Sequence, residues 1–343
     1  MKIQKIDGSF GEGGGQIIRS SITLSCITKI PIEINNIRKN RLRPGLQAQH
    51  LTSIKILAKI CNADVEGLKI GSTTIRFVPH QVESCSLKEN IGTAGSISLL
   101  LQVLIPSVAV AGKNLKLSII GGTDVKWSPT IDYTQYVLSK AYSRMGINFS
   151  LDVKKRGYYP RGGGIVNIDV SPSKNIQPIN LLERKTYDAK LLCSFSKFSK
   201  DIIINSIEKI EKELASKGFS VDSDIKEETS IDNGSTMLVY SFDSGSIIGS
   251  DGLFDSKRGR FPEYISRDFF SNNLGVDEHL ADMLVLPASL SKEISVFRVH
   301  KITKHLETNL YITSKISGCR YGIGKLNSGY EVRIIGNSDS SIQ

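Results

Sequence analysis

The sequence lacks a long apolar segment. The longest apolar run among its 343 residues, 97–111, is interrupted by Gln102 and Pro106, whereas a membrane-spanning helix needs about 20 apolar residues. The first ten residues also lack the apolar centre of a secretory signal. These absences predict a protein with no membrane partner, and we expect it in the cytoplasm.

Cysteine is scarce and scattered. The five cysteines are Cys26, Cys61, Cys85, Cys193 and Cys319. Because their number is odd and no Cys-x-x-Cys pair occurs, neither a disulfide framework nor a zinc site is indicated. We expect these thiols to be buried.

The common nucleotide-binding signatures are missing too. The chain has no Gly-x-x-x-x-Gly-Lys-[Ser/Thr] loop, no complete Gly-x-Gly-x-x-Gly fingerprint, no His-Glu-x-x-His pair and no nucleophile elbow. Positive charge, in contrast, is in excess, since 44 Lys and Arg against 34 Asp and Glu give a net charge of +10. That excess favours a polyanionic partner such as RNA or a nucleotide, although a solvated basic surface has the same composition.

Helical and strand patterns alternate along the chain and indicate an α/β (α+β) fold. Segments with apolar residues at helical spacing recur in pairs, and the pairs suggest three copies of one structural unit. The expected helices are 15–27 and one after 43–45 in the first copy, 96–104 and 131–145 in the second, and one from 277 followed by a shorter one from 305 in the third.

A different pattern separates the second copy from the third. Its expected elements are a strand at 187–195, a charged amphipathic helix at 200–218, and strands at 221–229 and 237–242 around the turn Asp232-Asn233-Gly234. Insertions are tolerated at exposed loops, where the ends of the inserted chain lie close together. We therefore predict a small α/β domain, 184–273, inserted into a large domain formed by 1–183 and 274–343.

A glycine-rich loop precedes the first expected helix, in residues 11–19 (GEGGGQIIR). Glycines let the backbone approach a ligand closely, and a helix start offers free N–H groups and a positive dipole end to an anion. Glu12 could hold a divalent cation beside phosphate oxygens, and Arg19, one turn into the helix, could reach the same phosphates. A glycine-rich turn without a ligand is the alternative.

Two further segments concentrate cations. The first surrounds Pro44-Gly45 and contains Arg38, Arg41, Arg43, Gln49 and His50. Its guanidinium groups suit bidentate phosphate recognition. The second, 154–164 (KKRGYYPRGGG), could stack a base and grip backbone phosphates. A solvated basic loop and a β-hairpin turn are the respective alternatives.

A lone histidine is more often structural than catalytic, but two of the five have suggestive neighbours. His305 follows Lys301 and Lys304, which would favour the approach of a phosphate, and a neutral imidazole there could act as a nucleophile. His279 and Asp282 are three residues apart on one expected helix and so share a face. They could contact a ligand or each other.

Five of these segments, taken in order, resemble the RNA 3'-terminal phosphate cyclases. They are GEGGGQIIR (11–19), RLRPGLQAQH (41–50), YYPRGGG (158–164), EHLAD (278–282) and HLETN (305–309). The resemblance covers nearly the whole chain. It implies a large domain of three repeats, each a four-stranded sheet with two helices, and a small inserted α/β domain, in agreement with the repeats and insertion expected from the residues.

The resemblance also implies a reaction of the ligase class. Such an enzyme uses ATP to convert an RNA 3'-terminal phosphate into a 2',3'-cyclic phosphodiester and releases AMP and pyrophosphate. His305 would attack the α-phosphorus of ATP and carry AMP as a phosphoramidate. AMP would then pass to the RNA 3'-phosphate, and the neighbouring 2'-hydroxyl would displace it, with fixed cations stabilising the charge on the phosphoryl oxygens.

The same resemblance assigns the other site residues. Those expected to bind ATP are Arg19, Gln102, Pro129, His279, Leu280, Ala281, Asp282 and Met283. Arg38, Arg41 and Gln49 would bind the RNA and its phosphate, and Glu12 would bind Mg²⁺ or Mn²⁺. Met283 stands where the family often has Gln, and a thioether cannot make the paired hydrogen bonds of an amide, so the preference for ATP over other nucleotides is left open.

Two other functions stay open at this point. Cyclase-like proteins of ribosome biogenesis share the fold, have no cyclase activity and lack the nucleophilic histidine, which this chain has at position 305. Enolpyruvyl transferases have comparable sheet-and-helix repeats but need neither a histidine nucleophile nor RNA. The sequence favours the cyclase and predicts no particular oligomeric state.

Overall fold

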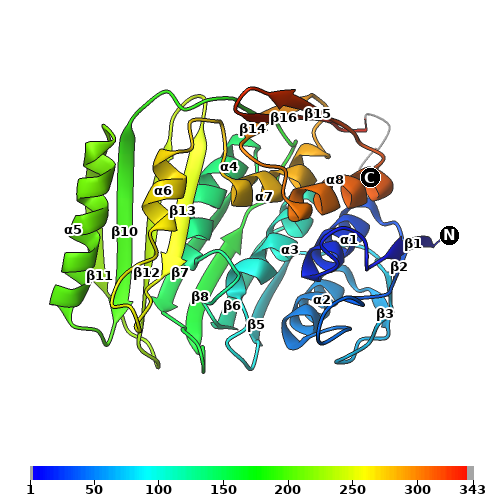
Figure 1. The fold of residues 1–343 in the computed structure, drawn as a ribbon. Coiled ribbons are helices and arrows are strands. Elements are labelled where there is room, and N and C mark those ends of the chain that lie inside the picture. The colour runs from blue at the N-terminus through cyan, green and yellow to red at the C-terminus, as the bar shows by residue number, and fades with distance from the viewer. Residues whose placement is uncertain (1–2, 338–343) are drawn as a thin grey trace.

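The computed structural model describes residues 3–337, and its elements repeat in one order (Figure 1). The first unit consists of β1 (Gln4–Asp7), α1 (Gly15–Thr28), β2 (Ile32–Asn35), α2 (Ala48–Cys61), β3 (Asp64–Glu66) and β4 (Ile75–Val78). The second consists of β5 (Cys85–Asn90), α3 (Ile97–Val110), β6 (Leu115–Gly121), the π-helix η1 (Tyr133–Leu138) continuing as α4 (Ser139–Arg144), β7 (Phe149–Lys155) and β8 (Gly164–Val170). The third consists of β9 (Asn180–Leu181), α7 (Glu278–Ala288), β14 (Ser295–Val299), α8 (Lys304–Ser317), β15 (Arg320–Leu326) and β16 (Gly329–Ile335).

The three units share one sheet topology. Their strand orders are β1-β2-β4-β3, β5-β6-β8-β7 and β9-β14-β16-β15. In each unit the first strand pairs parallel with the second, which follows the first helix of the unit, and the second pairs antiparallel with the fourth. The third strand lies beside the fourth at the sheet edge. The α/β (α+β) class expected from the alternating patterns is confirmed.

The third unit begins earlier than the sequence indicated. Its first strand, β9, precedes the segment 184–273 and pairs parallel with β14, whereas we expected this copy to start at 277. A two-residue strand is too short to show a period-two pattern. The expectation of a shorter second helix was also wrong, because α8 has 14 residues and α7 has 11.

The segment between β9 and α7 forms a fourth sheet with its own hydrophobic cluster. Its elements are β10 (Asp188–Ser196), α5 (Lys200–Ser216), β11 (Ser220–Glu227), β12 (Gly234–Phe242), β13 (Ile247–Leu253) and α6 (Tyr264–Phe270). Side chains of α5 such as Ile203, Ile207 and Leu214 pack with Phe261 and Phe269 in that cluster. The boundaries of an inserted domain at 184 and 273 stay a prediction.

The strands of this segment are not paired as the sequence suggested. The order is β11-β10-β12-β13, so β10 lies between β11 and β12. The turn Asp232-Asn233-Gly234 therefore does not close a hairpin. The first strand pairs parallel with the strand that follows helix α5, as a crossover connection permits.

The helices of the three units form the centre of the molecule, and the sheets surround them (Figure 1). Helix α1 packs against α2, α3 and α8, and α7 packs against α8. Nearly all of α3 is buried, and Pro106 is accommodated inside it. Within residues 3–337, none of the helices combines the length and the apolar character that crossing a membrane requires.

A buried ion cluster joins the second unit to the fourth sheet. Arg156, 3% exposed, follows β7 and bonds Asp124 at 3.2 Å, Asp132 at 2.8 Å and the carboxylate of Glu228. Its Nη2 also donates to Ser194 Oγ at 2.8 Å. One guanidinium thus holds two carboxylates of the second unit and one from the loop after β11, although burial still raises the pKa of Asp124 to about 6.

We expect Arg156→Met to lower the free energy of unfolding by about 3–5 kcal/mol, because it leaves Asp124 and Asp132 buried without a cation. Urea denaturation monitored by circular dichroism measures the change. Arg161→Met is the matched control from the same loop, since Arg161 pairs with Asp232 but its side chain is 63% exposed, and we expect it to cost at most about 1 kcal/mol. Equal losses in the two variants would contradict the assignment.

Candidate active site

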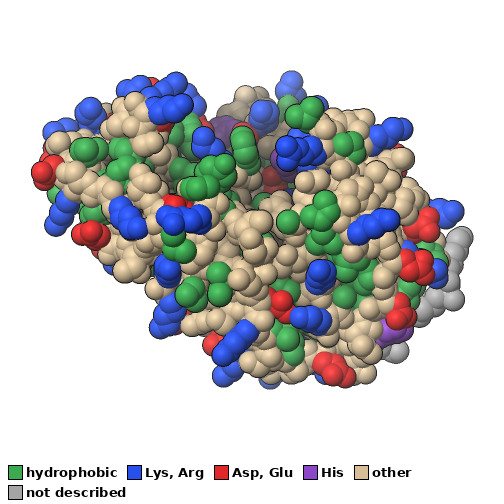
Figure 2. Space-filling view, turned by 90° about the horizontal axis from the view of Figure 1, so that it is seen from below, with side chains coloured by type: hydrophobic (Ala, Val, Ile, Leu, Met, Phe, Trp, Pro, Cys, Tyr) green, Lys and Arg blue, Asp and Glu red, His purple; other side chains and the backbone are tan. Residues whose placement is uncertain are grey.

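Two adjoining cavities lie between the repeat units and the fourth sheet. The molecule is hollowed between its two lobes (Figure 2). The large cavity has a volume of about 1120 Å³ and the small cavity about 850 Å³. They share Gln16, Arg19, the loop 125–128 and His305. A ligand in one cavity therefore borders a ligand in the other.

The residues expected from the sequence separate between these cavities. Glu12, Arg38, Arg41 and Gln49, expected to bind metal and RNA phosphate, line the large cavity. The small cavity is lined by Gln102, Pro129, His279, Asp282 and Met283, all expected to bind ATP. Arg19 and His305 line both.

Two expected ATP-binding residues lie elsewhere. Leu280 and Ala281 have fully buried side chains in the hydrophobic core and line neither cavity. Because the motif 278–282 is helical, some of its side chains face the small cavity and others face the hydrophobic core. His279 and Asp282, three residues apart, face the small cavity, and the residues between them face the core.

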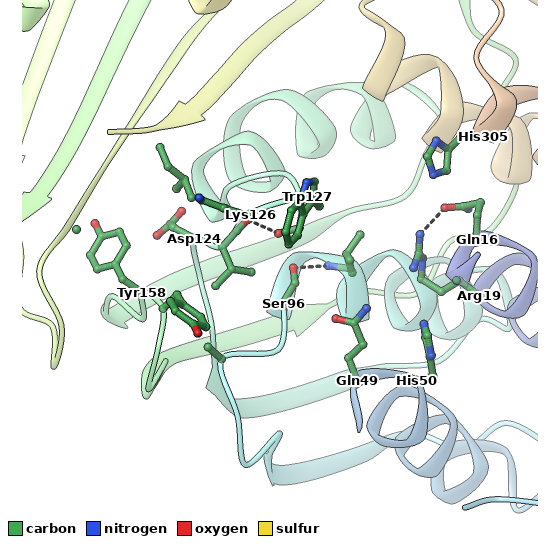
Figure 3. A pocket seen from close by; sticks show the side chains of 18 of the residues that line it. Gln16, Arg19, Gln49, His50, Ser96, Asp124, Lys126, Trp127, Tyr158 and His305 are labelled. Atoms are coloured by element: carbon green, nitrogen blue, oxygen red, sulfur yellow. Dashed lines mark hydrogen bonds between the residues drawn. The ribbon is translucent and has the colours of Figure 1, made fainter. Parts of the chain in front are cut away.

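The first turns of four helices converge on the large cavity. Gly15 and Arg19 come from α1, His50 from α2, Leu99 from α3 and His305 from α8. Helix N-termini present unpaired N–H groups and a positive dipole end. Together with the arginines they make this cavity suited to an anion, and Figure 3 shows Arg19 between His305 and His50.

The glycine-rich loop before α1 positions Glu12. Gly11 adopts a φ of +61° and packs against Thr308, whose Oγ1 accepts the Glu12 N–H at 3.1 Å. A side chain at Gly14 would collide with the carboxylate of Glu12, so the glycine lets that carboxylate fold back over the start of α1. One carboxylate oxygen pairs with Arg41, and the other, Oε2, is buried without a hydrogen-bond partner.

His305 lies on the first turn of α8, whose N-terminus is fixed by its cap. Thr303 Oγ1 accepts the N–H of Leu306 at 2.9 Å. The His305 side chain is 46% exposed, with Nε2 3.8 Å from Glu12 Oε1. Burial, followed by the charges of Arg19, His279 and Arg41, lowers the pKa of His305. The imidazole is therefore neutral near pH 7, which is the form a nucleophile needs.

Arg19 connects the two cavities. Its Nη2 donates to Gln16 Oε1 at 2.6 Å, and Gln16 donates to Asn309 Oδ1 at 2.9 Å. Burial lowers the pKa of Arg19 to about 10, so the guanidinium keeps its charge at pH 7. Its Nε has no hydrogen-bond partner, which leaves donor capacity for a ligand.

The small cavity has an acidic wall beside His279. Burial raises the pKa of Asp282 to about 7, and Thr303 Oγ1 donates to its Oδ1 at 2.8 Å. Burial by itself would lower the pKa of His279, but the charges of Asp251, Asp277 and Asp282 outweigh that effect, so its pKa is raised. An imidazole and a carboxyl group on one helix face can hold the polar atoms of a nucleoside.

Sequence reasoning missed one prominent lining residue. Trp127 borders both cavities, is 97% exposed and has a φ of +63°, a conformation that bulky residues rarely adopt. It stands in the centre of the site in Figure 3. The signal was present, because it is the chain's one tryptophan and lies in the polar segment before Pro129.

The segment 154–164 is a β-hairpin turn, and it also contributes aromatic side chains to the large cavity. It connects the antiparallel strands β7 and β8, and both Tyr158 and Tyr159 line the large cavity. Tyr158 is 4% exposed and Tyr159 78%. Arg161 is engaged by Asp232, with its Nε 2.9 Å from Oδ1, so this guanidinium is held by a carboxylate of the protein itself.

Known proteins that are similar to this chain include RNA 3'-terminal phosphate cyclases. The sequence profile of a family described as RNA 3'-terminal phosphate cyclase matches residues 10–323. The chain is similar to the RNA 3'-terminal phosphate cyclase of Methanococcoides burtonii, with 39% identity over 344 residues that cover 96% of this chain and 99% of that protein. For the RNA 3'-terminal phosphate cyclase of Hyperthermus butylicus the identity is 37% over 351 residues, covering 96% and 97%. A weaker likeness, with a TM-score of 0.41 and 8% identity, is to the enolpyruvyl transferase NikO from Streptomyces tendae and covers all of this chain and 50% of that one. The chain belongs to the RNA 3'-terminal phosphate cyclase family.

Proposed function

We propose that this protein uses ATP to convert an RNA 3'-terminal phosphate into a 2',3'-cyclic phosphodiester, with AMP and pyrophosphate as the other products. The observation that carries the proposal is the position of His305. Its neutral imidazole stands where the cavity lined by the expected ATP residues meets the cavity lined by arginines. A group bound to this ring can be loaded from one side and transferred to the other.

The reaction divides into three displacements at phosphorus. An imidazole nitrogen of His305 attacks the α-phosphorus of ATP, the bond to the β-phosphate oxygen breaks, and pyrophosphate leaves. An oxygen of the RNA 3'-phosphate then attacks the same phosphorus, and the P–N bond breaks. In the last step the 2'-hydroxyl oxygen attacks the 3'-phosphorus, loses its proton and expels AMP. Covalent catalysis of this kind replaces one difficult step with easier ones.

The lining residues suit the charges that these steps create. Arg19 borders both cavities, and Arg38 and Arg41 border the large one, so guanidinium groups surround the place where phosphoryl oxygens gain charge. Pro129 and Met283 offer apolar contact to a base in the small cavity. Trp127 offers an exposed aromatic face on which an RNA base can stack.

Glu12 fits a divalent metal ion that is shared with a substrate. Among residues 3–337 no group of three or more His, Cys, Asp or Glu side chains could hold a metal by itself. Mg²⁺, however, is commonly held by one or two carboxylates together with substrate phosphates, and the buried Oε2 of Glu12 has no hydrogen-bond partner. When bound, Mg²⁺ or Mn²⁺ would neutralise phosphate charge.

Product analysis tests the proposal. We expect a labelled RNA that ends in a 3'-phosphate to become resistant to phosphatase after incubation with the protein, ATP and Mg²⁺, because a cyclic diester has no terminal monoester. The same RNA without ATP is the control. RNA that binds to the protein but stays sensitive to phosphatase would instead identify a non-catalytic RNA-binding protein.

A further inference from the structure

His50 has an unused hydrogen-bond donor in the large cavity. The residue is 3% exposed and lies in the first turn of α2, where its Nδ1 accepts the backbone N–H of Gln47 at 3.1 Å. The ring is neutral, since burial and the charges of Arg19 and Arg38 lower its pKa to about 3. A neutral ring that accepts at Nδ1 carries its proton on Nε2.

The Nε2–H group has no partner inside the protein. His50 Nε2 is buried and makes no hydrogen bond, and the Nε atoms of Arg19 and Arg38 are in the same state. Leaving a buried donor unsatisfied is costly, and three such donors line one cavity. A common acceptor outside the chain would explain all three.

Gly15 lets His50 and Arg19 pack closely against the start of α1. A Cβ at position 15 would lie 2.6 Å from His50 Nε2 and 2.9 Å from Arg19 Nη1. His50 Nε2 and Arg19 Nη1 therefore lie near one another beside the first residue of α1, which brings two nitrogen donors to one place in the large cavity. An oxygen of an anion there could accept from both, and the helix N-terminus adds to the attraction.

The place of His50 indicates which substrate supplies the anion. His50 lines the large cavity with Arg38, Arg41 and Gln49 and does not line the small cavity, where the expected ATP residues lie. We infer that His50 is a fixed, neutral hydrogen-bond donor to the terminal phosphate of the RNA, an assignment that rests on the proposed function. It is a binding and positioning residue, separate from the nucleophile His305.

Two substitutions compare a side chain that keeps both hydrogen bonds of His50 with one that makes neither, and the comparison of two RNAs distinguishes the donor from the structural role of the ring. Gln at this position of a helix can accept the N–H of the capping residue with its carbonyl and still donate through its amide, so His50→Gln should stay close to wild type. His50→Met has similar length but no donor. We expect His50→Met to weaken binding of a short 3'-phosphorylated RNA by about tenfold to 100-fold, with no comparable loss for the same RNA ending in a 3'-hydroxyl.

The salt dependence of binding gives a readout that misfolding would not imitate. A neutral donor releases no counterion, so the slope of log K against log salt should be the same for His50→Met and wild type. Arg38→Gln is the comparison variant, and its slope should be shallower by about 0.7. Thermal melting of each variant verifies that it is folded.

The outcomes distinguish this inference from the proposed function. If the wild-type protein prefers the 3'-phosphorylated RNA and a folded His50→Met shows the same preference, the inference about His50 is wrong and the proposed function stands. If His50→Met lowers only the labelling of the protein by ATP, the donor serves the nucleotide, and the assignment to RNA is overturned. If the wild type does not discriminate between the two RNAs, the inference about His50 is wrong, and the formation of phosphatase-resistant RNA decides the proposed function by itself.

Discussion

His305→Ala should abolish transfer of AMP to the protein, with a fall of at least about 10⁴-fold in the rate of labelling by ATP. The expected size reflects the removal of the attacking atom itself, since none of the neighbouring side chains can take over its position. Incubation with ATP labelled in the α-phosphate, followed by denaturing electrophoresis, measures the adduct.

The chemistry of the label and a matched histidine complete this test. A phosphoramidate on imidazole is labile in acid and stable in alkali, unlike an ester of Ser or Thr. His80→Ala is the control, because His80 is exposed, contacts Asp64 at 3.1 Å and lines neither cavity. An adduct of unchanged yield in His305→Ala would place AMP on another residue and would overturn His305 as the nucleophile.

The repeated units could be predicted because their helices are long and periodic. The helix 15–27 was expected and α1 spans Gly15–Thr28; in the same way 200–218 corresponds to α5. Two of the elements that were missed are short or lack a clear period. β9 has two residues, and β13 contains two glycines in a nearly continuous buried run. The wrong pairing of β11 with β12 arose because a turn motif specifies a bend but not the neighbour in the sheet.

The candidate site was predictable as motifs and not as geometry. Each motif gives residue types near one another in the chain, whereas the two cavities bring together residues from α1, α2, α3 and α8. The role of His50 depends on which ring nitrogen meets Gln47, and that contact follows from the helix cap in three dimensions. Leu280 and Ala281 were expected to bind ATP because they belong to the motif 278–282, but helical geometry turns their side chains into the core.

Arg19→Ala should impair both transfer of AMP to His305 and its passage to RNA, each by about 10²–10³-fold. The reason is the position of Arg19, which borders both cavities and has an unpaired Nε. Arg19→Lys should recover little of either loss, since an ammonium cannot reproduce the planar fork of a guanidinium. Labelling by ATP measures the first step, and addition of 3'-phosphorylated RNA to protein already carrying AMP measures the second.

A variant of a second arginine distinguishes the effect of the position of Arg19 from the effect of its charge. Arg43 belongs to the same basic segment as Arg38 and Arg41 but is exposed and lines neither cavity. Arg43→Ala removes one positive charge, as Arg19→Ala does, and should leave both steps within about threefold of wild type, because exposed charges are screened by salt. Similar losses in the two variants would mean that overall charge attracts the substrates and that Arg19 has no special place.

The defect of Arg19→Ala should also depend on pH. The charge of Arg19 is one cause of the lowered pKa of His305, so removing it lets that pKa rise toward its ordinary value of about 6.5. At pH 8 the ring is neutral in both proteins, but at pH 6 a larger fraction is protonated in the variant and cannot attack phosphorus. The loss in labelling by ATP should therefore be greater at pH 6 than at pH 8. A loss that is constant over this range would show that Arg19 acts on the phosphate alone and does not tune the nucleophile.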